Sequence, residues 1–497
     1  AQVRYPAALP AGGDMSKRFF WYDFESTGID PRRDRPVQVA GLATNAELEE
    51  VGEPLCIDAR LPSDVLPHPQ ACLVTGITPQ RLANGLPEAE FIQRLHEQMM
   101  QPGTCSVGYN NLRFDDEMTR FSLYRNFHDP YAREWQGGNS RWDLLDALRA
   151  AHALRPEGIE WPQVEGFTSL RLELLTAANG IDHGQAHDAL ADVRATIAMA
   201  RLLKRAQPRL FDYLLGLRDK RRVAEFIELQ QVRPLVHVSG RFGRERSGLS
   251  LVLPLGWHPI NRNAVIVYDL AADPAALTDM APEQVRERLY TRTEDLPEGQ
   301  VRPGLKLVHI NKCPVLADTK VLLPADIERL QLDMPLLLAR AEQLAHWREQ
   351  GQGTLAEIYR EQPGDSAEQD AEVQLYDGFL SDADRRLMTA IREADGAALG
   401  AMRWPLRDQR LVDMLPRYRA RNFPDSLNSE EQQQWLAWCA ARLSGAAPGA
   451  PVTLPVFLQE IDALLPTLDA AQQALLQSWR AYGVQQAQLL GIQQTAG

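Results

Sequence analysis

The sequence lacks long hydrophobic runs, is poor in cysteine and carries no excess of positive charge. No stretch approaches the roughly 18 consecutive apolar residues of a membrane span, which argues against a membrane protein. There are no internal repeats or low-complexity tracts, which argues against a solenoid. The few cysteines form no Cys-x-x-Cys pair, which argues against a disulfide scaffold or zinc site and favours a reducing, cytoplasmic location; they are Cys56, Cys72, Cys105, Cys313 and Cys439.

The charge is distributed unevenly along the chain. The formal net charge is −13, which taken alone disfavours nucleic acid as a partner. Between Arg201 and Arg246, however, twelve lysines and arginines stand against five acidic residues. This basic run is consistent with a solvated surface between domains, and equally with a positive channel that binds phosphates.

A chain of 497 residues is too long for one hydrophobic core, so several domains are expected. Residues 1–16, with a methionine at position 15, are interpreted as an unstructured leader or tag. Strand-like runs followed by helical patterns predict an α/β domain over 17–207. Short apolar runs between Gly, Pro and Asn turns predict a β-rich antiparallel domain over 208–360, and the acidic helical patterns that follow predict a third domain over 361–497.

Two acids lie on an otherwise apolar strand near the start, in "FFWYDFESTG". Side chains two apart on a strand share a face, so Asp23 and Glu25 point the same way. Paired carboxylates offer hard oxygen ligands to Mg²⁺ or Mn²⁺. The same Asp-x-Glu spacing recurs at 326–328 and 370–372, and we interpret both of those pairs as helical and without a functional role.

Further acids follow in two segments. Asp115, in "NNLRFDDEMTR", comes after a strand-like run near a helix start, where it is either a functional acid or a favourable charge in a first helical turn. In "HGQAHDALADV", His187 and Asp192 are five apart and share no helix face, so His187 is placed in the turn before the helix and Asp192 within it. Asp188 is predicted to cap that helix. A lone histidine in such a loop can also be purely structural.

In their order along the chain and in the residues that surround them, these acids and the histidine resemble those of the DEDDh exonuclease superfamily. The resemblance becomes closer in longer motifs across the chain, which is similar to the bacterial exodeoxyribonuclease I family over about residues 17–490; these motifs are "GYNNLRFDDE", "SRWDLL", "ALRPEGI", "AHDALADV", "RPLVHVSG", "HPINRNAVI", "LVHINKCPVLA" and "YRARNFP". The resemblance implies an α/β fold with an N-terminal RNase H-like DEDDh exonuclease domain, an SH3-like β-rich domain and a C-terminal α-helical domain.

The resemblance also implies an activity, the processive 3′-to-5′ hydrolysis of single-stranded DNA to 5′-mononucleotides in DNA repair and recombination. Asp23 is expected to bridge two Mg²⁺ ions, for which Mn²⁺ can substitute. Glu25 and Asp192 are expected to complete one metal site and Asp115 to support the other. His187 is expected to act as the general base.

The resemblance further predicts residues that contact the DNA strand from several segments; they are Glu25, Arg171, Arg120, Tyr131, Trp135, Arg149, Gln185, Lys220, Asn263, Lys306 and His309. Several of these can equally be packing or surface residues. A second expected partner is the C-terminal tail of single-stranded DNA-binding protein, at Arg155 and Tyr213. Leu323 stands where the family often has an arginine, which leaves the strength of that contact open. No membrane partner is expected, and the chain is expected to be a monomer.

Two alternatives remain open at this stage. One keeps the fold and changes the substrate, as in a DEDDh exoribonuclease or a proofreading exonuclease. The other is a catalytically inactive protein that binds single-stranded DNA. The presence of all five catalytic residue types argues against the second alternative.

Overall fold

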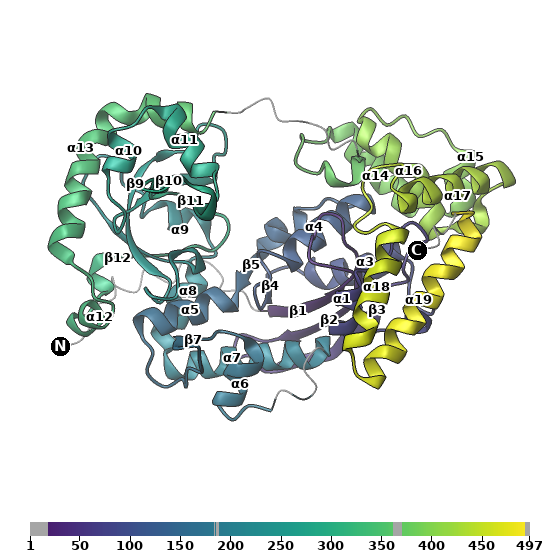
Figure 1. The fold of residues 1–497 in the computed structure, drawn as a ribbon, viewed down its shortest axis with the longest axis horizontal. Helices are drawn as coiled ribbons and strands as arrows, with labels where there is room; N and C mark the ends of the chain where they lie inside the picture. Colours follow the sequence, from purple (N-terminus) through teal and green to yellow (C-terminus); the bar gives the residue numbers. More distant parts are fainter. Residues whose placement is uncertain (1–17, 183, 185–187, 361–369, 493–497) are drawn as a thin grey trace. The chain divides into compact units, whose positions relative to one another are not determined.

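The structure is a computed structural model that describes residues 18–182, 184, 188–360 and 370–492 (Figure 1). The predicted leader therefore lies outside the described residues. The chain divides into two compact units, which we call the N/C unit and the middle unit. The N/C unit comprises Ser16–Asn139, His183–Arg194 and Asp365–Gly497, and the middle unit contains Ser140–Asp182 and Ala195–Gly364. The three predicted domain ranges are placed where the pattern of predicted strands and helices changes along the sequence, and they stay a prediction.

The N/C unit contains the sheet on which the paired acids lie. Four strands of this five-stranded sheet belong to the unit and have the order β3-β2-β1-β4, with β1 antiparallel to β2 and parallel to β4; they are β1 (Arg18–Ser26), β2 (Pro36–Thr44), β3 (Glu50–Asp58) and β4 (Thr104–Gly108). Alternate β1 side chains, namely Phe20, Tyr22 and Phe24, join the core cluster that includes residues of α3 (Glu88–Met99) and α4 (Asp115–Arg125). Because a strand alternates its side chains, Asp23 and Glu25 face away from this cluster.

The C-terminal helices of the N/C unit share a hydrophobic core with its N-terminal part. Phe457, Leu476 and Trp479 belong to one buried cluster with Leu66 and Ile77, and the Trp479 indole donates to the Ile77 carbonyl oxygen at 2.9 Å. Figure 1 shows α18 (Leu454–Leu464) and α19 (Ala470–Leu490), both in yellow, beside α1 (Pro69–Thr75). Further helices of this unit are α2 (Pro79–Ala83), α14 (Asp382–Glu393), α15 (Gly396–Ala401), α16 (Gln409–Asn422) and α17 (Ser429–Ser444).

The middle unit is built around an antiparallel sheet, which confirms the β-rich prediction. The strand order is β11-β10-β9-β8-β12, and the strands are β8 (Leu235–Val238), β9 (Leu249–Trp257), β10 (Ala264–Asp269), β11 (Leu305–His309) and β12 (Val315–Asp318). The long helix α13 (Met334–Ile358) lies along β9, where Arg348 donates to the Pro254 carbonyl oxygen at 2.9 Å. Pro254 lacks a backbone N–H, and this contact gives its carbonyl oxygen a hydrogen-bond donor.

The sheet of the middle unit is preceded by helices. Those before it are α5 (Leu144–Leu154), α6 (Leu172–Ala178), α7 (Ala189–Ala206), α8 (Pro208–Gly216) and α9 (Lys220–Ala224), with β5 (Ser140–Asp143), β6 (Gln163–Val164) and β7 (Phe167–Thr168) among them. The later helices are α10 (Ala275–Thr278), α11 (Pro282–Tyr290) and α12 (Pro324–Arg329). The division between the two units falls within α7. Across the described residues, no helix is both long and apolar enough to cross a membrane.

Candidate active site

Strand β1 delivers two carboxylates to its C-terminal end. Asp23 pairs with Ala40 and Glu25 with Gln38 on β2, and the register shifts just after Glu25, where the strand ends. The chain then turns at Thr27, whose hydroxyl donates to the Asp34 carboxylate at 2.9 Å. A side chain on Gly28 would collide with Asp34 and His68, because a Cβ there would lie 2.4–2.6 Å from their atoms. The glycine therefore keeps this turn closed against the strand end.

Helix α7 supplies a third carboxylate from its first turn. The helix is capped as predicted, since the Asp188 side chain accepts from the backbone nitrogens of Leu190 and Ala191 at 3.0 and 3.3 Å. One turn later Asp192 meets β1. Carboxylate oxygens of Asp23, Glu25 and Asp192 all lie within 4.8 Å of one another. The structure thus brings together three of the four predicted metal ligands in one cluster.

Asp115, the fourth predicted ligand, lies at the start of α4. It is buried, and its Oδ1 accepts from the Phe24 backbone nitrogen at 3.1 Å, so it is held against the same strand. Its negative charge is near enough to raise the pKa of Asp23. His187 and Gln185, the predicted general base and a predicted strand contact, lie outside the described residues.

Burial and neighbouring acids dominate the electrostatics of this cluster. Burial, followed by the charges of Asp115 and Asp192, raises the pKa of Asp23 well above its ordinary value. Burial, followed by Asp23, Asp192 and Asp188, raises the pKa of Glu25 from 4.5 to about 8. Hard oxygen ligands that repel one another are a fitting donor set for a divalent cation, which neutralises them. The residues present therefore fit a divalent metal site.

This crowding predicts a pH-dependent stability for the metal-free protein. A carboxyl whose pKa is raised by folding favours the folded state at low pH and disfavours it as the pH rises. In EDTA, the melting temperature should therefore fall between about pH 4.5 and pH 8, the range between the ordinary and the shifted pKa of Glu25. Adding Mg²⁺ or Mn²⁺ at pH 8 should restore it. Thermal melts across this pH range measure both effects, and a melting temperature indifferent to the metal at pH 8 would contradict the prediction.

Besides Glu25 and Gln185, the predicted strand contacts of the N/C unit are Arg120, Tyr131 and Trp135. Arg120 is buried and donates to Glu134 at 2.7 and 2.9 Å and to Glu117 at 2.9 Å. Its guanidinium lies 5.3 Å from the centre of the Tyr131 ring, so it also supports that ring. Trp135 is 67% exposed, as expected of a side chain available for base stacking. The two glutamates neutralise much of the Arg120 charge, which sequence reasoning could not see.

Four predicted strand contacts gather in the β-rich part of the middle unit. Lys220 donates to the Asn263 side-chain oxygen at 3.4 Å. Lys306, on β11, donates to Nε2 of the buried His237 at 2.8 Å. Burial, together with nearby cations that include Lys312 and Lys306, lowers the pKa of His309 to about 4. A cation-rich region thus surrounds β11.

The other predicted residues of the middle unit are paired within the chain. Arg149 pairs with Asp146, and the exposed Arg171 donates to Glu173 at 2.6 Å. At the predicted peptide site, Arg155 is buried and its Nη1 lies 3.1 Å from Asp326, which lies in α12 as the helical interpretation of the 326–328 pair predicts. The Tyr213 hydroxyl donates to the Leu316 carbonyl oxygen at 2.6 Å. The functional roles assigned to these residues stay predictions.

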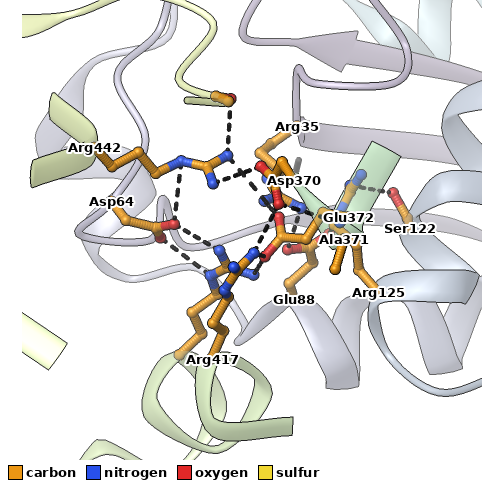
Figure 2. A network of polar contacts seen from close by, with 12 residues as sticks. Arg35, Asp64, Glu88, Ser122, Arg125, Asp370, Ala371, Glu372, Arg417 and Arg442 are labelled. Atoms are coloured by element: carbon orange, nitrogen blue, oxygen red, sulfur yellow. Dashed lines mark hydrogen bonds and ion pairs between the residues drawn. The ribbon is translucent and has the colours of Figure 1, made fainter. Parts of the chain in front are cut away.

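Sequence reasoning missed a buried ionic network in the N/C unit. From sequence, Asp370 and Glu372 are interpreted as a helical pair without a functional role. Asp370 caps the short 3-10 turn Ala371–Val373, Glu372 lies within it, and both are almost fully buried among arginines (Figure 2). Glu372 lies 2.5 Å from Arg35 and 2.7 Å from Arg421. The other members of the network are Asp64, Glu88, Arg125, Arg417 and Arg442. No local sequence signal marks these contacts, because the partners are from 37 to more than 300 residues apart.

Comparison with known proteins agrees with the fold and the carboxylate cluster. The family model "Exonuclease" matches residues 20–200, "Exonuclease I SH3-like domain" matches 218–361 and "Exonuclease I C-terminal domain" matches 369–486. Fold and site together define a nuclease of the exonuclease class. More narrowly, the chain belongs to the exodeoxyribonuclease I family, because these models and full-length relatives cover most of it.

Two curated relatives show how close the likeness is. The exodeoxyribonuclease I of Escherichia coli (strain K12) is 48% identical over 426 residues, which cover 85% of this chain and 89% of that protein. The exodeoxyribonuclease I of Haemophilus influenzae (strain ATCC 51907 / DSM 11121 / KW20 / Rd) is 44% identical over 435 residues, which cover 86% of this chain and 91% of the relative.

Solved structures of the family superpose closely. E. coli exonuclease I in complex with a dA16 oligonucleotide, and a zinc-bound form of its complex with single-stranded DNA, each have a TM-score of 0.90 at 45% identity and cover 95% of this chain and 100% of theirs. An exonuclease I/SSB-Ct complex has a TM-score of 0.87 at 44% identity and covers 95% of this chain and 99% of its own.

Proposed function

We propose that this chain is a Mg²⁺-dependent 3′-to-5′ exonuclease that hydrolyses single-stranded DNA to 5′-mononucleotides. The observation that carries the proposal is the cluster of Asp23, Glu25 and Asp192, three carboxylates whose oxygens lie within 4.8 Å of one another. Relatives solved with DNA oligonucleotides, one of them with zinc, support the substrate and a divalent cation. Membership of this family also supports a role in DNA repair and recombination, in the cytoplasm.

The residues take the following roles in this proposal. Asp23, Glu25 and Asp192 would hold the metal ions, with Asp115 at the same site. Two bound cations would acidify the attacking water and stabilise the charge that develops on the phosphate. His187 takes the proton from that water, and Arg171 holds the 3′-terminal nucleotide. Glu25 and Asp115 are buried, and the bond that Asp115 accepts from the Phe24 backbone nitrogen would hold that acid in place while the strand advances.

In this proposal, cations and aromatic rings hold the strand. Tyr131 and Trp135 stack on bases, while Lys220, Asn263, Lys306 and His309 contact the backbone. Contacts at several points slow the departure of a strand after each cleavage, so digestion is processive. An excess of unlabelled strand added after the reaction starts should therefore leave strands already bound to be digested to completion.

The experiment that tests the reaction is digestion of single-stranded DNA carrying a label at one end. With Mg²⁺, 3′-labelled strands should release labelled mononucleotide at once, whereas 5′-labelled strands should shorten stepwise. EDTA should stop both reactions, and His187→Ala should slow them about 10²- to 10⁴-fold through loss of the general base. Earliest release from the 5′ end would overturn the assignment. Faster cleavage of RNA or duplex ends would favour the exoribonuclease or proofreading alternative, and binding without cleavage would favour the inactive binding protein.

We also propose that the middle unit binds the C-terminal tail of single-stranded DNA-binding protein, since a relative has been solved as an exonuclease I/SSB-Ct complex. Arg155 and Tyr213 are the candidate contacts. Leu323 is half-buried at the start of α12 and brings no charge. We therefore expect saturable binding of a labelled tail peptide, strengthened by Leu323→Arg. Absence of saturable binding to the wild-type chain would contradict this proposal.

A further inference from the structure

Helix α4 is bonded to β1 on both sides of Asp23. On one side the Phe24 backbone nitrogen donates to Asp115 at 3.1 Å. On the other side the Tyr22 hydroxyl donates to Oδ1 of Asp116 at 2.5 Å. Tyr22 is the chain neighbour of Asp23, and Asp116 is the chain neighbour of Asp115. The bond between the two neighbours, which we call the Tyr22–Asp116 link, therefore joins the peptide segments that carry two of the acids.

The Tyr22–Asp116 link is fully buried and its charge is compensated. Tyr22 is 1% exposed and Asp116 is 0% exposed. The buried guanidinium of Arg133 donates to the same Oδ1 of Asp116 at 3.1 Å. Burial and the Asp116 charge raise the pKa of Tyr22 well above its ordinary value, so the phenol keeps its proton and acts as the donor.

Packing alone does not account for a tyrosine at this position. Tyr22 lies in the same buried cluster as Phe20 and Phe24, and a third phenylalanine would fill such a site without any polar group to satisfy. Burying a hydroxyl, a carboxylate and a guanidinium is unfavourable unless each is paired, and three residues here are committed to that pairing. What the pairing provides is a fixed position of the α4 N-terminus on β1.

We infer that Tyr22 and Asp116 are positioning residues that hold Asp23 and Asp115 at the spacing a divalent cation requires. The inference rests on the proposed function, in which these two acids serve the metal site. Outer-shell partners of metal ligands typically change metal affinity by about 10- to 100-fold when they are removed. The Tyr22–Asp116 link acts one residue away from the ligands, through the backbone, so it sets metal affinity without touching the metal or the DNA.

The test compares Tyr22→Phe with Tyr124→Phe in the full-length chain. Tyr124 is a matched control, because it is a fully buried tyrosine of α4 whose hydroxyl donates elsewhere, to the Ala371 carbonyl oxygen at 3.0 Å. Mn²⁺ binding is measured calorimetrically without DNA, and melting temperatures are measured in EDTA. Both variants should lose stability, but only Tyr22→Phe should weaken Mn²⁺ binding, by about 10-fold.

Asp116→Asn gives a second variant that separates position from charge. An asparagine keeps the Oδ1 acceptor for both Tyr22 and Arg133, so Mn²⁺ affinity should stay near that of the wild type although the melting temperature falls. If Tyr22→Phe binds Mn²⁺ as tightly as the wild type, or if Tyr22→Phe and Tyr124→Phe weaken Mn²⁺ binding equally, this inference is overturned and the proposed function is not. A wild-type chain that binds no Mn²⁺ would instead overturn the proposed function, and this inference with it.

Discussion

Replacing Asp23 with asparagine should abolish nuclease activity and at the same time stabilise the metal-free protein. Asp23 is central to the carboxylate cluster, and its own pKa is raised by burial and by Asp115 and Asp192. Loss of a metal ligand removes several kcal/mol of transition-state stabilisation. The rate should therefore fall by a factor of at least about 10³. Without metal, however, the substitution removes one of several mutually repelling charges. The melting temperature in EDTA at pH 8 should therefore rise, by a few degrees.

The opposite signs of the two effects make this prediction specific. The control is Asp58→Asn, at the end of β3, where the carboxylate lies 2.7 Å from the guanidinium of Arg81 and outside the carboxylate cluster. Neutralising that paired acid should leave activity intact and should not raise the melting temperature. Initial rates with Mg²⁺ and thermal melts in EDTA measure both quantities. If the Asp23→Asn variant has a lower melting temperature in EDTA than the wild type, while that of Asp58→Asn is unchanged, the acids of the cluster do not repel one another.

The sequence was sufficient to predict the parts of the site that depend on local periodicity. Strand alternation places Asp23 and Glu25 on one face, and the N-cap position of Asp188 determines where α7 begins. The start of α4 at Asp115 follows from the same kind of signal. These features depend on a few neighbouring residues, so a pattern of residue types predicts them without knowledge of the rest of the chain.

The two Asp-x-Glu pairs at 23–25 and 370–372 show why the rest could not be predicted. The pairs are identical as sequence, yet burial and neighbouring acids raise the pKa of Glu25 to about 8. Despite its burial, arginines led by Arg421 hold the pKa of Glu372 well below its ordinary value. What distinguishes them is the charge of side chains delivered from distant segments. Arg35, for example, precedes Glu372 by 337 residues.

The surface that the C-terminal helices cover could not be predicted for a related reason. The change in residue pattern near residue 360 predicts where a C-terminal domain begins, and the structure adds that Trp479 of α19 lies in one buried cluster with Ile77 of the N-terminal part. Hydrophobic periodicity shows that a helix has an apolar face and does not show which surface covers it. The Tyr22–Asp116 link could not be predicted either, because the sequence of an aromatic strand does not show whether the hydroxyl of its tyrosine has a partner.

The largest loss of stability is expected from Glu372→Gln. This carboxylate is 2% exposed and joins Arg35 of the N-terminal part to Arg421 of α16 within the N/C unit (Figure 2). Removing one member of a buried ionic network leaves the opposite charges uncompensated, which typically costs about 3–5 kcal/mol. Urea unfolding at pH 7 measures the loss. The control is Asp462→Asn, which breaks an exposed pair with Arg480 and should change the free energy of unfolding by less than about 1 kcal/mol.

The pH dependence of this loss identifies its cause. Because the pKa of Glu372 is lowered on folding, its ionised form stabilises the protein above its ordinary pKa of 4.5, and that contribution disappears as the pH falls further. The difference in unfolding free energy between wild type and Glu372→Gln should therefore be full at pH 7 and should shrink below about pH 4.5. A difference that stayed constant down to pH 3 would mean that glutamine disturbs packing. Because the network joins β-sheet and helical parts that share one core, its loss should also expose the turn Ala371–Val373 to proteolysis before the sheet unfolds.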